Sequence, residues 1–148
     1  MESENDRSTR NLGELLQELR VVQAGVQFLF GFLLAVAFTD RYAKASGFEQ
    51  AVHLIAVGFA TVAVACLTAP VAWHRLLFRR GQRPQILKVA NVLTVVGLAC
   101  LAVAMTATVL LLFEVVAGPT AAALVTAVTA ITFATLWFVL PLRTRNDT

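Results

Sequence analysis

Charged residues are scarce in this sequence, and their scarcity is the first clue to the environment of the chain. They make up 14% of the 148 residues, whereas soluble domains carry about a quarter. A helix on the surface of a soluble domain needs a polar face, so long uncharged runs exclude a soluble fold. A run of about 20 apolar residues is enough to cross the hydrocarbon core of a bilayer. Four runs without Asp, Glu, Lys or Arg have about this length or more, at 21–39, 51–73, 89–113 and 120–142.

Cysteine is also rare, with only Cys66 and Cys100 in the chain, each deep in an apolar run. Neither has a His, an Asp or another Cys at the spacing of metal ligands. Two such residues do not imply a disulfide framework. We expect them to act as small apolar side chains, and we expect no cofactor and no metal site.

The uncharged runs are continuous, which argues against a membrane β-barrel, whose strands alternate over about ten residues. We predict an all-α fold: a bundle of four transmembrane helices preceded by a short amphipathic cytoplasmic helix. A single membrane domain would occupy 11–142, after a disordered acidic and polar N-terminus at 1–10 and before a short cytoplasmic tail at 143–148. Gly118-Pro119 is so short a connection that the last two spans must be antiparallel neighbours.

The first span is predicted to be a transmembrane helix and not a signal peptide that is cleaved off. Its residues Ala35-Val36-Ala37 resemble the cleavage site of a signal peptide. A signal peptide, however, begins with a positively charged region, and residues 1–20 carry five acidic residues against three arginines.

The distribution of Lys and Arg predicts the orientation of the four spans. If the spans alternate in direction, ten of the twelve cations share one side, and only Arg41 and Lys44 lie on the other. The positive-inside rule then places both termini and the loop between the second and third spans in the cytoplasm. The ten cations are Arg7, Arg10, Arg20, Arg75, Arg79, Arg80, Arg83, Lys88, Arg143 and Arg145.

The loop between the second and third spans holds five of these cations. Besides setting the orientation, they would attract anionic lipid head groups, at about 1 kcal/mol for each charge near the surface. Binding of single-stranded nucleic acid would need several aromatic side chains on which bases can stack. Phe78 is the one aromatic inside the loop, and Trp73 before it suits an interfacial anchor, so no nucleic-acid partner is expected.

An amphipathic segment at 11–23 precedes the first span, with leucines at helical spacing on one face. It would lie along the membrane surface or run straight into the span. Its polar face carries Glu14 and Glu18 where surface helices usually carry Lys and Arg. These carboxylates are either solvated or docked on the basic loop. The docked alternative gives a candidate cytoplasmic charge cluster of Glu14, Glu18, His74, Arg75, Arg79 and Arg80.

Ionisable residues are missing from the middle of every span. His53 begins the second span and His74 ends it, and both are expected to be interfacial histidines. Glu114 follows the third span on the same side as Arg41, so a Glu114–Arg41 ion pair is a candidate outer-side site. The sharper alternative is that Glu114 forms an ion-entry site.

Amides and prolines also mark the spans. Gln23 and Gln27 lie four residues apart at the start of the first span and could hydrogen-bond across a helix interface. The threonines of the last span are expected to bond their own helix backbone. Pro70 and Pro141 lie near the ends of their spans and should kink the helices, because proline leaves a carbonyl without its donor.

The stretches NLGELLQELRVVQAGVQFLFGFLLAVAF and APVAWHRLLFRR resemble a family of small uncharacterised bacterial membrane proteins with four predicted helices, some automatically named sodium:proton antiporters. The likeness runs from about residue 11 to about residue 141, and 14–20 and 74–79 carry most of it. The resemblance implies the four-helix fold and a location in the bacterial inner membrane, not an activity. The antiporter label fits these residues poorly, since such exchange normally needs a carboxylate buried at mid-membrane.

Three classes of function follow from these observations. The first is a non-enzymatic structural or interaction component, acting as a homo-oligomer or with an unknown membrane partner. The second is a small ion- or proton-linked transporter or channel that works as a homo-oligomer. The third, an enzyme, is not expected. His74, Arg75 and Glu18 could meet on the cytoplasmic surface, but no nucleophile, phosphate loop or metal motif accompanies them.

Overall fold

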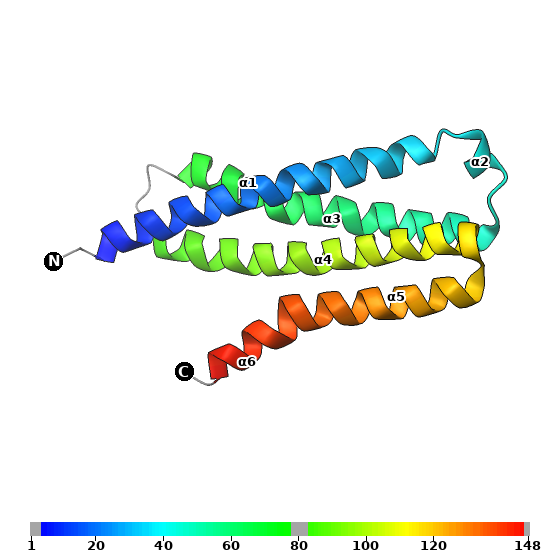
Figure 1. Cartoon of the computed structure of the whole chain (residues 1–148). Coiled ribbons are helices and arrows are strands. Elements are labelled where there is room, and N and C mark those ends of the chain that lie inside the picture. Colours follow the sequence, from blue (N-terminus) through cyan, green and yellow to red (C-terminus); the bar gives the residue numbers. More distant parts are fainter. Residues whose placement is uncertain (1–3, 78–82, 147–148) are drawn as a thin grey trace.

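A computed structural model describes residues 4–77 and 83–146 (Figure 1). Within these ranges the side chains of 4–9, 11–12, 15–16, 18, 74–77, 83–87 and 144–146 lie outside the description. The helices in chain order are α1 (Glu4–Val36), α2 (Asp40–Ala43), α3 (Gly47–Leu77), α4 (Arg83–Ala117), α5 (Pro119–Ala134), a π-helical turn η1 (Thr135–Val139) and α6 (Leu140–Asn146). The described ranges contain no strand, so the all-α prediction is confirmed.

Within residues 4–77 and 83–146, four helical stretches are long and apolar enough to cross a membrane, as the uncharged runs predict. Each stretch overlaps one of the four predicted spans. Their length and composition are those of a multi-pass membrane protein. The stretches are Leu19–Val36, Gly47–Trp73, Lys88–Ala117 and Pro119–Arg143.

The N-terminal prediction needs a correction, because α1 begins at Glu4 and continues without a break into the first span. Residues 4–10 are therefore helical where the sequence suggests disorder, and the amphipathic segment runs straight into the span. Acidic residues near a helix N-terminus are favourable beside the positive end of its dipole. Arg10 and Glu14, one turn apart, add an ion pair of 3.9 Å.

The ends of the outer spans also differ from the prediction by a few residues. α1 ends at Val36 instead of residue 39, because Thr39 caps α2: its hydroxyl accepts a hydrogen bond of 3.3 Å from the backbone N–H of Tyr42. At the other end of the chain, helix α6 continues past residue 142 as far as Asn146.

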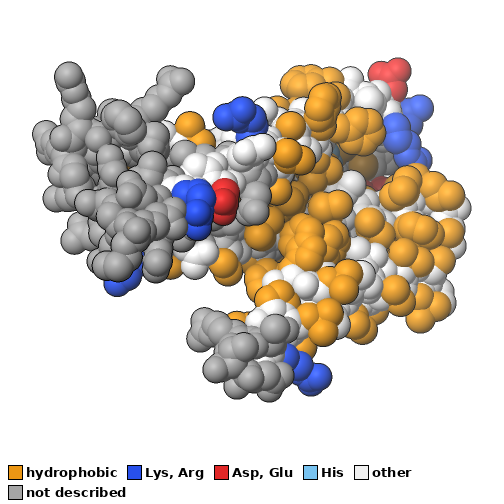
Figure 2. Space-filling model, turned by 60° about the vertical axis from the view of Figure 1, so that its left-hand side comes forward, with side chains coloured by type: hydrophobic (Ala, Val, Ile, Leu, Met, Phe, Trp, Pro, Cys, Tyr) orange, Lys and Arg blue, Asp and Glu red, His pale blue; other side chains and the backbone are white. Residues whose placement is uncertain are grey.

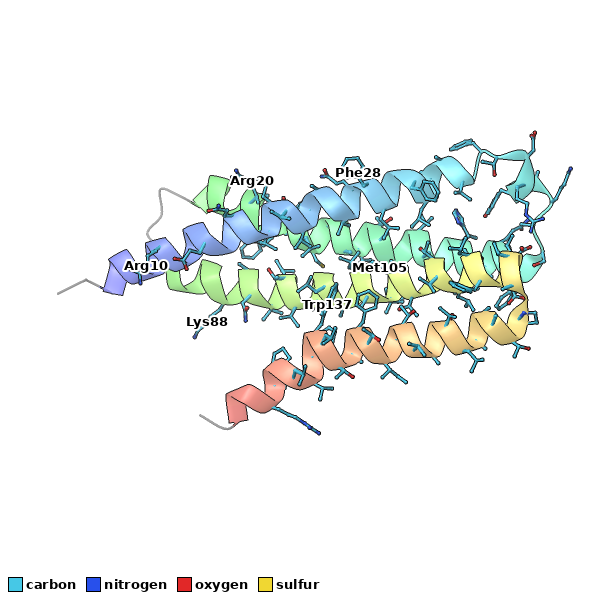
Figure 3. The ribbon with its side chains drawn as sticks, in the orientation of Figure 1. Arg10, Arg20, Phe28, Lys88, Met105 and Trp137 are labelled. Atoms are coloured by element: carbon cyan, nitrogen blue, oxygen red, sulfur yellow. The ribbon has the colours of Figure 1, made fainter. Side chains whose placement is uncertain are left out.

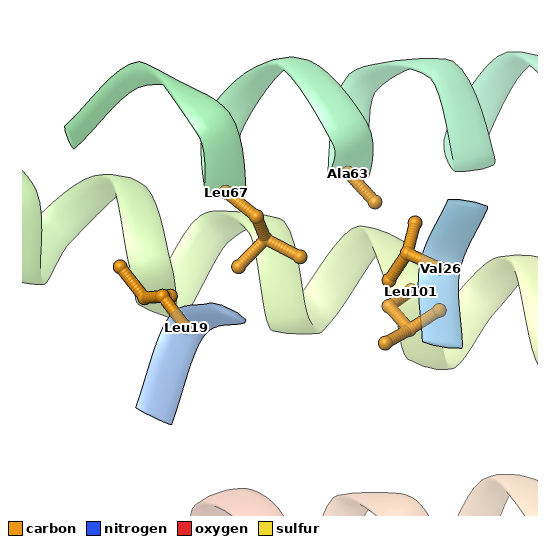
Figure 4. Packing of buried hydrophobic residues seen from close by; sticks show 5 residues of the cluster. All are labelled: Leu19, Val26, Ala63, Leu67 and Leu101. Atoms are coloured by element: carbon orange, nitrogen blue, oxygen red, sulfur yellow. The ribbon is translucent and has the colours of Figure 1, made fainter. Parts of the chain in front are cut away.

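Helices α1, α3 and α4 form the packed core. Alanines at helical spacing on α3, with Ala104 on α4, let the helices approach closely, as small residues do in membrane proteins. Figure 4 shows how larger side chains fill the space between the three helices. This second cluster consists of Leu19, Val26, Ala63, Leu67 and Leu101.

Gly97 of α4 marks the tightest approach in this core. A Cβ added there would lie 2.8 Å from Cγ of Leu67 and 3.2 Å from Cβ of Cys66. Leu67 is fully buried, so it has little room to turn away. Glycine at position 97 is therefore what allows α3 and α4 to pack this closely.

Helix α5 lies on the outer side of α4, away from α1 (Figure 1). Its buried residue is Ala122, close to the Gly118 turn. Beyond α5, the backbone N–H of Leu140 bonds the carbonyl of Thr135, one residue further back than in an α-helix. Pro141 follows directly and has no N–H to offer the carbonyl of Trp137, so the π-helical turn accommodates the proline. Pro70, in contrast, lies inside the unbroken helix α3.

Gly118 makes the turn between α4 and α5 with φ of +84° and ψ of 174°, a region open essentially to glycine alone. We expect Gly118→Ala to lower the free energy of unfolding by about 1–2 kcal/mol because of this backbone strain. Thermal unfolding in mild detergent measures the effect. Gly31→Ala is the matched control, since Gly31 is helical and its added Cβ would meet nothing within 4 Å. Equal melting temperatures for the two variants would contradict the prediction.

Candidate functional site

The charged residues of the described surface lie toward the two ends of the molecule. Figure 2 shows hydrophobic side chains covering the surface between those ends. Arg10, Arg20 and Lys88 lie toward the end away from α2 (Figure 3). The α2 end carries its own compact set of polar side chains, drawn from α2, α3 and the loop between them. It is the best-defined candidate site in the described part of the chain.

The start of α3 is held by a capping box. The hydroxyl of Ser46 accepts a hydrogen bond of 3.2 Å from the backbone N–H of Glu49, and a carboxylate oxygen of Glu49 accepts one of 2.6 Å from the backbone N–H of Ser46. The side-chain amide of Gln50 also donates to the carbonyl of Ala45, at 3.2 Å. These bonds fix the direction in which the loop enters α3, and they fix the position of the Glu49 carboxylate.

Arg41 pairs with Glu49 rather than with Glu114, which corrects the predicted outer-side pair. The guanidinium Nη2 of Arg41 lies 3.4 Å from Oε1 of Glu49. Glu114 is half-buried in α4, and the described residues include no ion pair to it. The capping box explains the difference, because it holds the Glu49 carboxylate beside the short helix that carries Arg41.

His53 is buried, with 3% of its surface exposed, although the sequence suggests an interfacial position. It lies nearly two turns into α3, and its ring packs against Tyr42 with 4.9 Å between the ring centroids. Its Nε2 has no hydrogen-bond partner. A cavity of about 110 Å³ opens beside it, between α1, α2, α3 and α4.

Only one residue of the predicted cytoplasmic charge cluster, Glu14, has a described side chain. Glu14 is exposed and pairs with Arg10 of its own helix. The side chains of Glu18, His74, Arg75, Arg79 and Arg80 lie outside the described residues. Docking of the amphipathic segment on the basic loop therefore stays a prediction.

Gln23 bonds across a helix interface, as its position predicts. Its side-chain amide donates to the backbone carbonyl of Leu67, joining α1 to α3 inside the core. In the last span, the hydroxyls of Thr129 and Thr132 bond carbonyls of their own helix, which confirms the prediction for these two residues. Thr126 differs, because its hydroxyl is buried without a partner, beside an apolar groove of about 470 Å³ between α4 and α5.

Cys66 and Cys100 are free and half-buried in adjacent helices. Among the described residues, no group of three or more His, Cys, Asp or Glu side chains could hold a metal ion.

Ser46 gives a direct test of the capping box. Ser46→Ala should lower the free energy of unfolding by about 1 kcal/mol, because the N–H of Glu49 then loses its acceptor. Ser46→Thr is the control, since threonine keeps the hydroxyl. In mild detergent, the wild type and Ser46→Thr should have higher melting temperatures than Ser46→Ala. A Ser46→Thr variant as unstable as Ser46→Ala would count against the cap.

The profile of a family of unknown function (DUF6328) matches residues 1–141 of the sequence. No curated protein and no solved structure matches the chain.

Proposed function

The chain belongs to this family of unknown function (DUF6328), and we propose that it is a structural or interaction component of the bacterial inner membrane that associates with a second copy of itself. The association surface is the α5 stripe, which we define as Leu124, Val128 and Ile131. The observation that carries the proposal is the exposure of this stripe, whose three side chains are 65%, 64% and 65% exposed.

The α5 stripe has the spacing of a helix–helix contact. Its residues follow one another at intervals of four and three, so they lie on one face of α5. This spacing suits interdigitation with a second helix at a small crossing angle. An apolar stripe without charges is compatible with a copy of itself, as a two-fold interface requires. α5 packs on α4, and Ala122 is its buried residue. The face of α5 that carries the α5 stripe is therefore available for a partner.

The polar groups of the spans support association better than transport. The amide of Gln23 is committed to the carbonyl of Leu67, and the hydroxyls of Thr106 and Thr108 bond their own helix. The Gln23 bond holds α1 against α3, and hydroxyls that already bond their own backbone are not free to line a route for ions.

We place both termini and the basic loop on the cytoplasmic side, as the excess of cations on that side predicts. The loop then faces the anionic lipid head groups of the inner leaflet.

Cysteine crosslinking in membranes tests the association. In a background with Cys66→Ala and Cys100→Ala, Val128→Cys should form a covalent dimer with a short bifunctional maleimide. Phe28→Cys is the matched control: Phe28 is 82% exposed on α1 and lies eight residues before the end of that helix, while Val128 lies nine residues after the start of α5.

The expected result is a dimer for Val128→Cys and a monomer for Phe28→Cys. Co-expression with the cysteine-free chain should dilute the dimer, since mixed pairs cannot be crosslinked. Equal crosslinking at both positions, or none at either, would contradict the proposal.

A further inference from the structure

The apolar groove between α4 and α5, which we call the α4–α5 groove, is left open by the proposed association. On α5 its wall includes Thr126, Ala130 and Phe133. At about 100° of rotation per residue, these three residues lie on the face of α5 opposite the α5 stripe. A second copy seated on the stripe would therefore leave the groove uncovered.

The walls of the α4–α5 groove are suited to hydrocarbon. Apart from two threonines, they consist of alanine, valine, leucine and phenylalanine side chains. The hydroxyl of Thr106 already bonds the carbonyl of Ala102, and the hydroxyl of Thr126 is buried out of reach. The groove thus offers no free side-chain hydroxyl to a ligand, and a polar molecule inside it would lose hydrogen bonds without replacing them.

The dimensions of the α4–α5 groove are those of a single extended chain. It runs along α4 from Ala99 to Leu110, which is about 16 Å at 1.5 Å per residue. One leaflet contributes about half of the roughly 30 Å hydrocarbon core, so the groove is as long as one leaflet is thick. Over this length a volume of about 470 Å³ gives a width of roughly 6 Å, whereas an α-helix with its side chains is about 10–12 Å across. An acyl chain fits this width, and a helix of a second copy does not.

One end of the α4–α5 groove is closed and the other is open. Toward the Gly118 turn the two helices are packed together, and Ala122 is fully buried there. Toward the opposite end, α6 runs away from α4 (Figure 1). Val92 and Val95 continue the line of the groove along α4, and they are 60% and 47% exposed. The groove therefore extends toward the α6 end as an open apolar surface.

Cations mark the open end of the α4–α5 groove. Lys88 lies one turn before Val92 on the same face of α4, and it points toward the side of α4 on which α6 lies (Figure 3). Arg143 is carried by α6 itself. Both side chains are exposed, and neither forms an ion pair with a described residue. Between these two cations the sequence has one charged residue, Glu114, which lies toward the closed end. The charges are thus complementary to a molecule with an apolar chain and an anionic head, oriented with the head at the open end.

We propose that the α4–α5 groove binds one acyl chain of an anionic phospholipid, whose phosphate group lies at the open end, where Lys88 and Arg143 attract it. The hydrocarbon of lipid is as apolar as the walls of the groove, so the chain alone gives no preference for one lipid over another. The two cations supply the preference, because a Lys or Arg near the membrane surface favours an anionic head group.

Tryptophan fluorescence can report a chain in the α4–α5 groove. The sequence has two tryptophans, Trp73 and Trp137. The Trp137 ring packs on Phe133 of the groove wall, with 4.8 Å between the ring centroids, and lies between α4 and α5 (Figure 3). Protein with Trp73→Phe, in mild detergent, is titrated with phosphatidylglycerol whose acyl chains carry bromine atoms, which quench tryptophan on contact. We expect saturable quenching, with an apparent affinity about 25-fold higher than for brominated phosphatidylcholine with the same chains.

Charge variants test the recognition of the head group. Lys88→Gln and Arg143→Gln should each lower the apparent affinity for phosphatidylglycerol about fivefold, and they should leave that for phosphatidylcholine unchanged. Lys44→Gln is the control, because Lys44 follows α2 at the other end of the molecule. It should change neither affinity.

A larger side chain in the groove tests the position of the acyl chain. Ala130 is exposed and lines the α4–α5 groove, so Ala130→Leu would occupy the space of the acyl chain. Ala127→Leu is the matched control, since Ala127 is exposed on the same helix outside the groove wall. We expect Ala130→Leu to lower the apparent affinity for both lipids about tenfold, while the two variants keep the same melting temperature.

Three results would overturn the assignment. Quenching that does not saturate, or that is equal for the two lipids, would mean that Trp137 only meets bulk lipid. Unchanged quenching in Ala130→Leu would place the acyl chain outside the groove. A covalent dimer of Ala130→Cys, formed by the bifunctional maleimide in the cysteine-free background, would mean that a second copy covers the groove. Crosslinking of Val128→Cys is read separately, so association through the α5 stripe can fail or succeed independently of the lipid site.

Discussion

Leucine in place of Gly97 is expected to lower the free energy of unfolding by about 3 kcal/mol and to reduce the yield of monodisperse protein. Even a single added Cβ would lie 2.8 Å from Cγ of Leu67 and 2.9 Å from its Cδ2. Leu67 is fully buried between α1, α3 and α4, so it cannot move away without displacing a helix. The change therefore forces α3 and α4 apart at the centre of the core.

Gly58→Leu is the matched control for this prediction. Gly58 is exposed on α3, and an added Cβ there would meet nothing within 4 Å. A leucine at this position would extend into lipid or detergent, and leucine is also a better helix former than glycine. Melting in mild detergent should show a large loss for Gly97→Leu and none for Gly58→Leu. Equal stability of the two variants would mean that α3 and α4 do not pack as described.

Leu67→Ala should also lower the free energy of unfolding by about 3 kcal/mol, through the loss of packing instead of a clash. Its side chain belongs to the buried cluster of Figure 4, together with Leu19, Val26 and Leu101. Leu54→Ala provides the comparison, since Leu54 is 64% exposed on the same helix. Thermal unfolding should rank Leu54→Ala close to wild type and Leu67→Ala far below it.

The two core changes should partly compensate for each other when combined. Leu67→Ala vacates the space that a leucine at position 97 needs, so the Gly97→Leu/Leu67→Ala double variant should be more stable than the sum of the two losses predicts. An additive loss would contradict direct contact between the two positions.

The four long apolar helices could be predicted from the sequence because they reflect a simple physical requirement. A helix that crosses the hydrocarbon core of a bilayer needs about 20 predominantly apolar residues. The four runs without charged residues meet this requirement. The ends of the spans were harder to predict. Val36 ends α1 because Thr39 caps α2, and the described part of α1 extends back to Glu4, through polar residues that hydropathy would not join to the span. Such ends depend on local hydrogen bonds, which hydropathy does not report.

The polar end of the bundle could be predicted only in part. The pattern Ser46-x-x-Glu49 is the signature of a capping box, and recognising it would have placed the Glu49 carboxylate beside Arg41. The burial of His53 leaves no comparable signal. It depends on the ring of Tyr42 and on side chains of α1 and α4, which come together only in the fold.

The last span shows the same limit. Pro141 predicts a disturbed helix, but the sequence does not tell how the disturbance is absorbed. The π-helical turn at Thr135–Val139 absorbs it, whereas Pro70 is held within a continuous α3. Similarly, the position of Gln23 predicts a bond across an interface, and only the packing of α1 on α3 identifies the carbonyl of Leu67 as its partner.

Cysteine accessibility in intact cells tests the central claim, namely that the chain crosses the membrane four times with both ends on the cytoplasmic side. Single cysteines at Ser3, Lys44 and Asp147, in the background without Cys66 and Cys100, would be treated with a maleimide that cannot cross membranes. The account predicts labelling of Lys44→Cys in intact cells, and labelling of Ser3→Cys and Asp147→Cys only after lysis. Labelling of one terminus but not the other in intact cells, or of Lys44→Cys only after lysis, would contradict it.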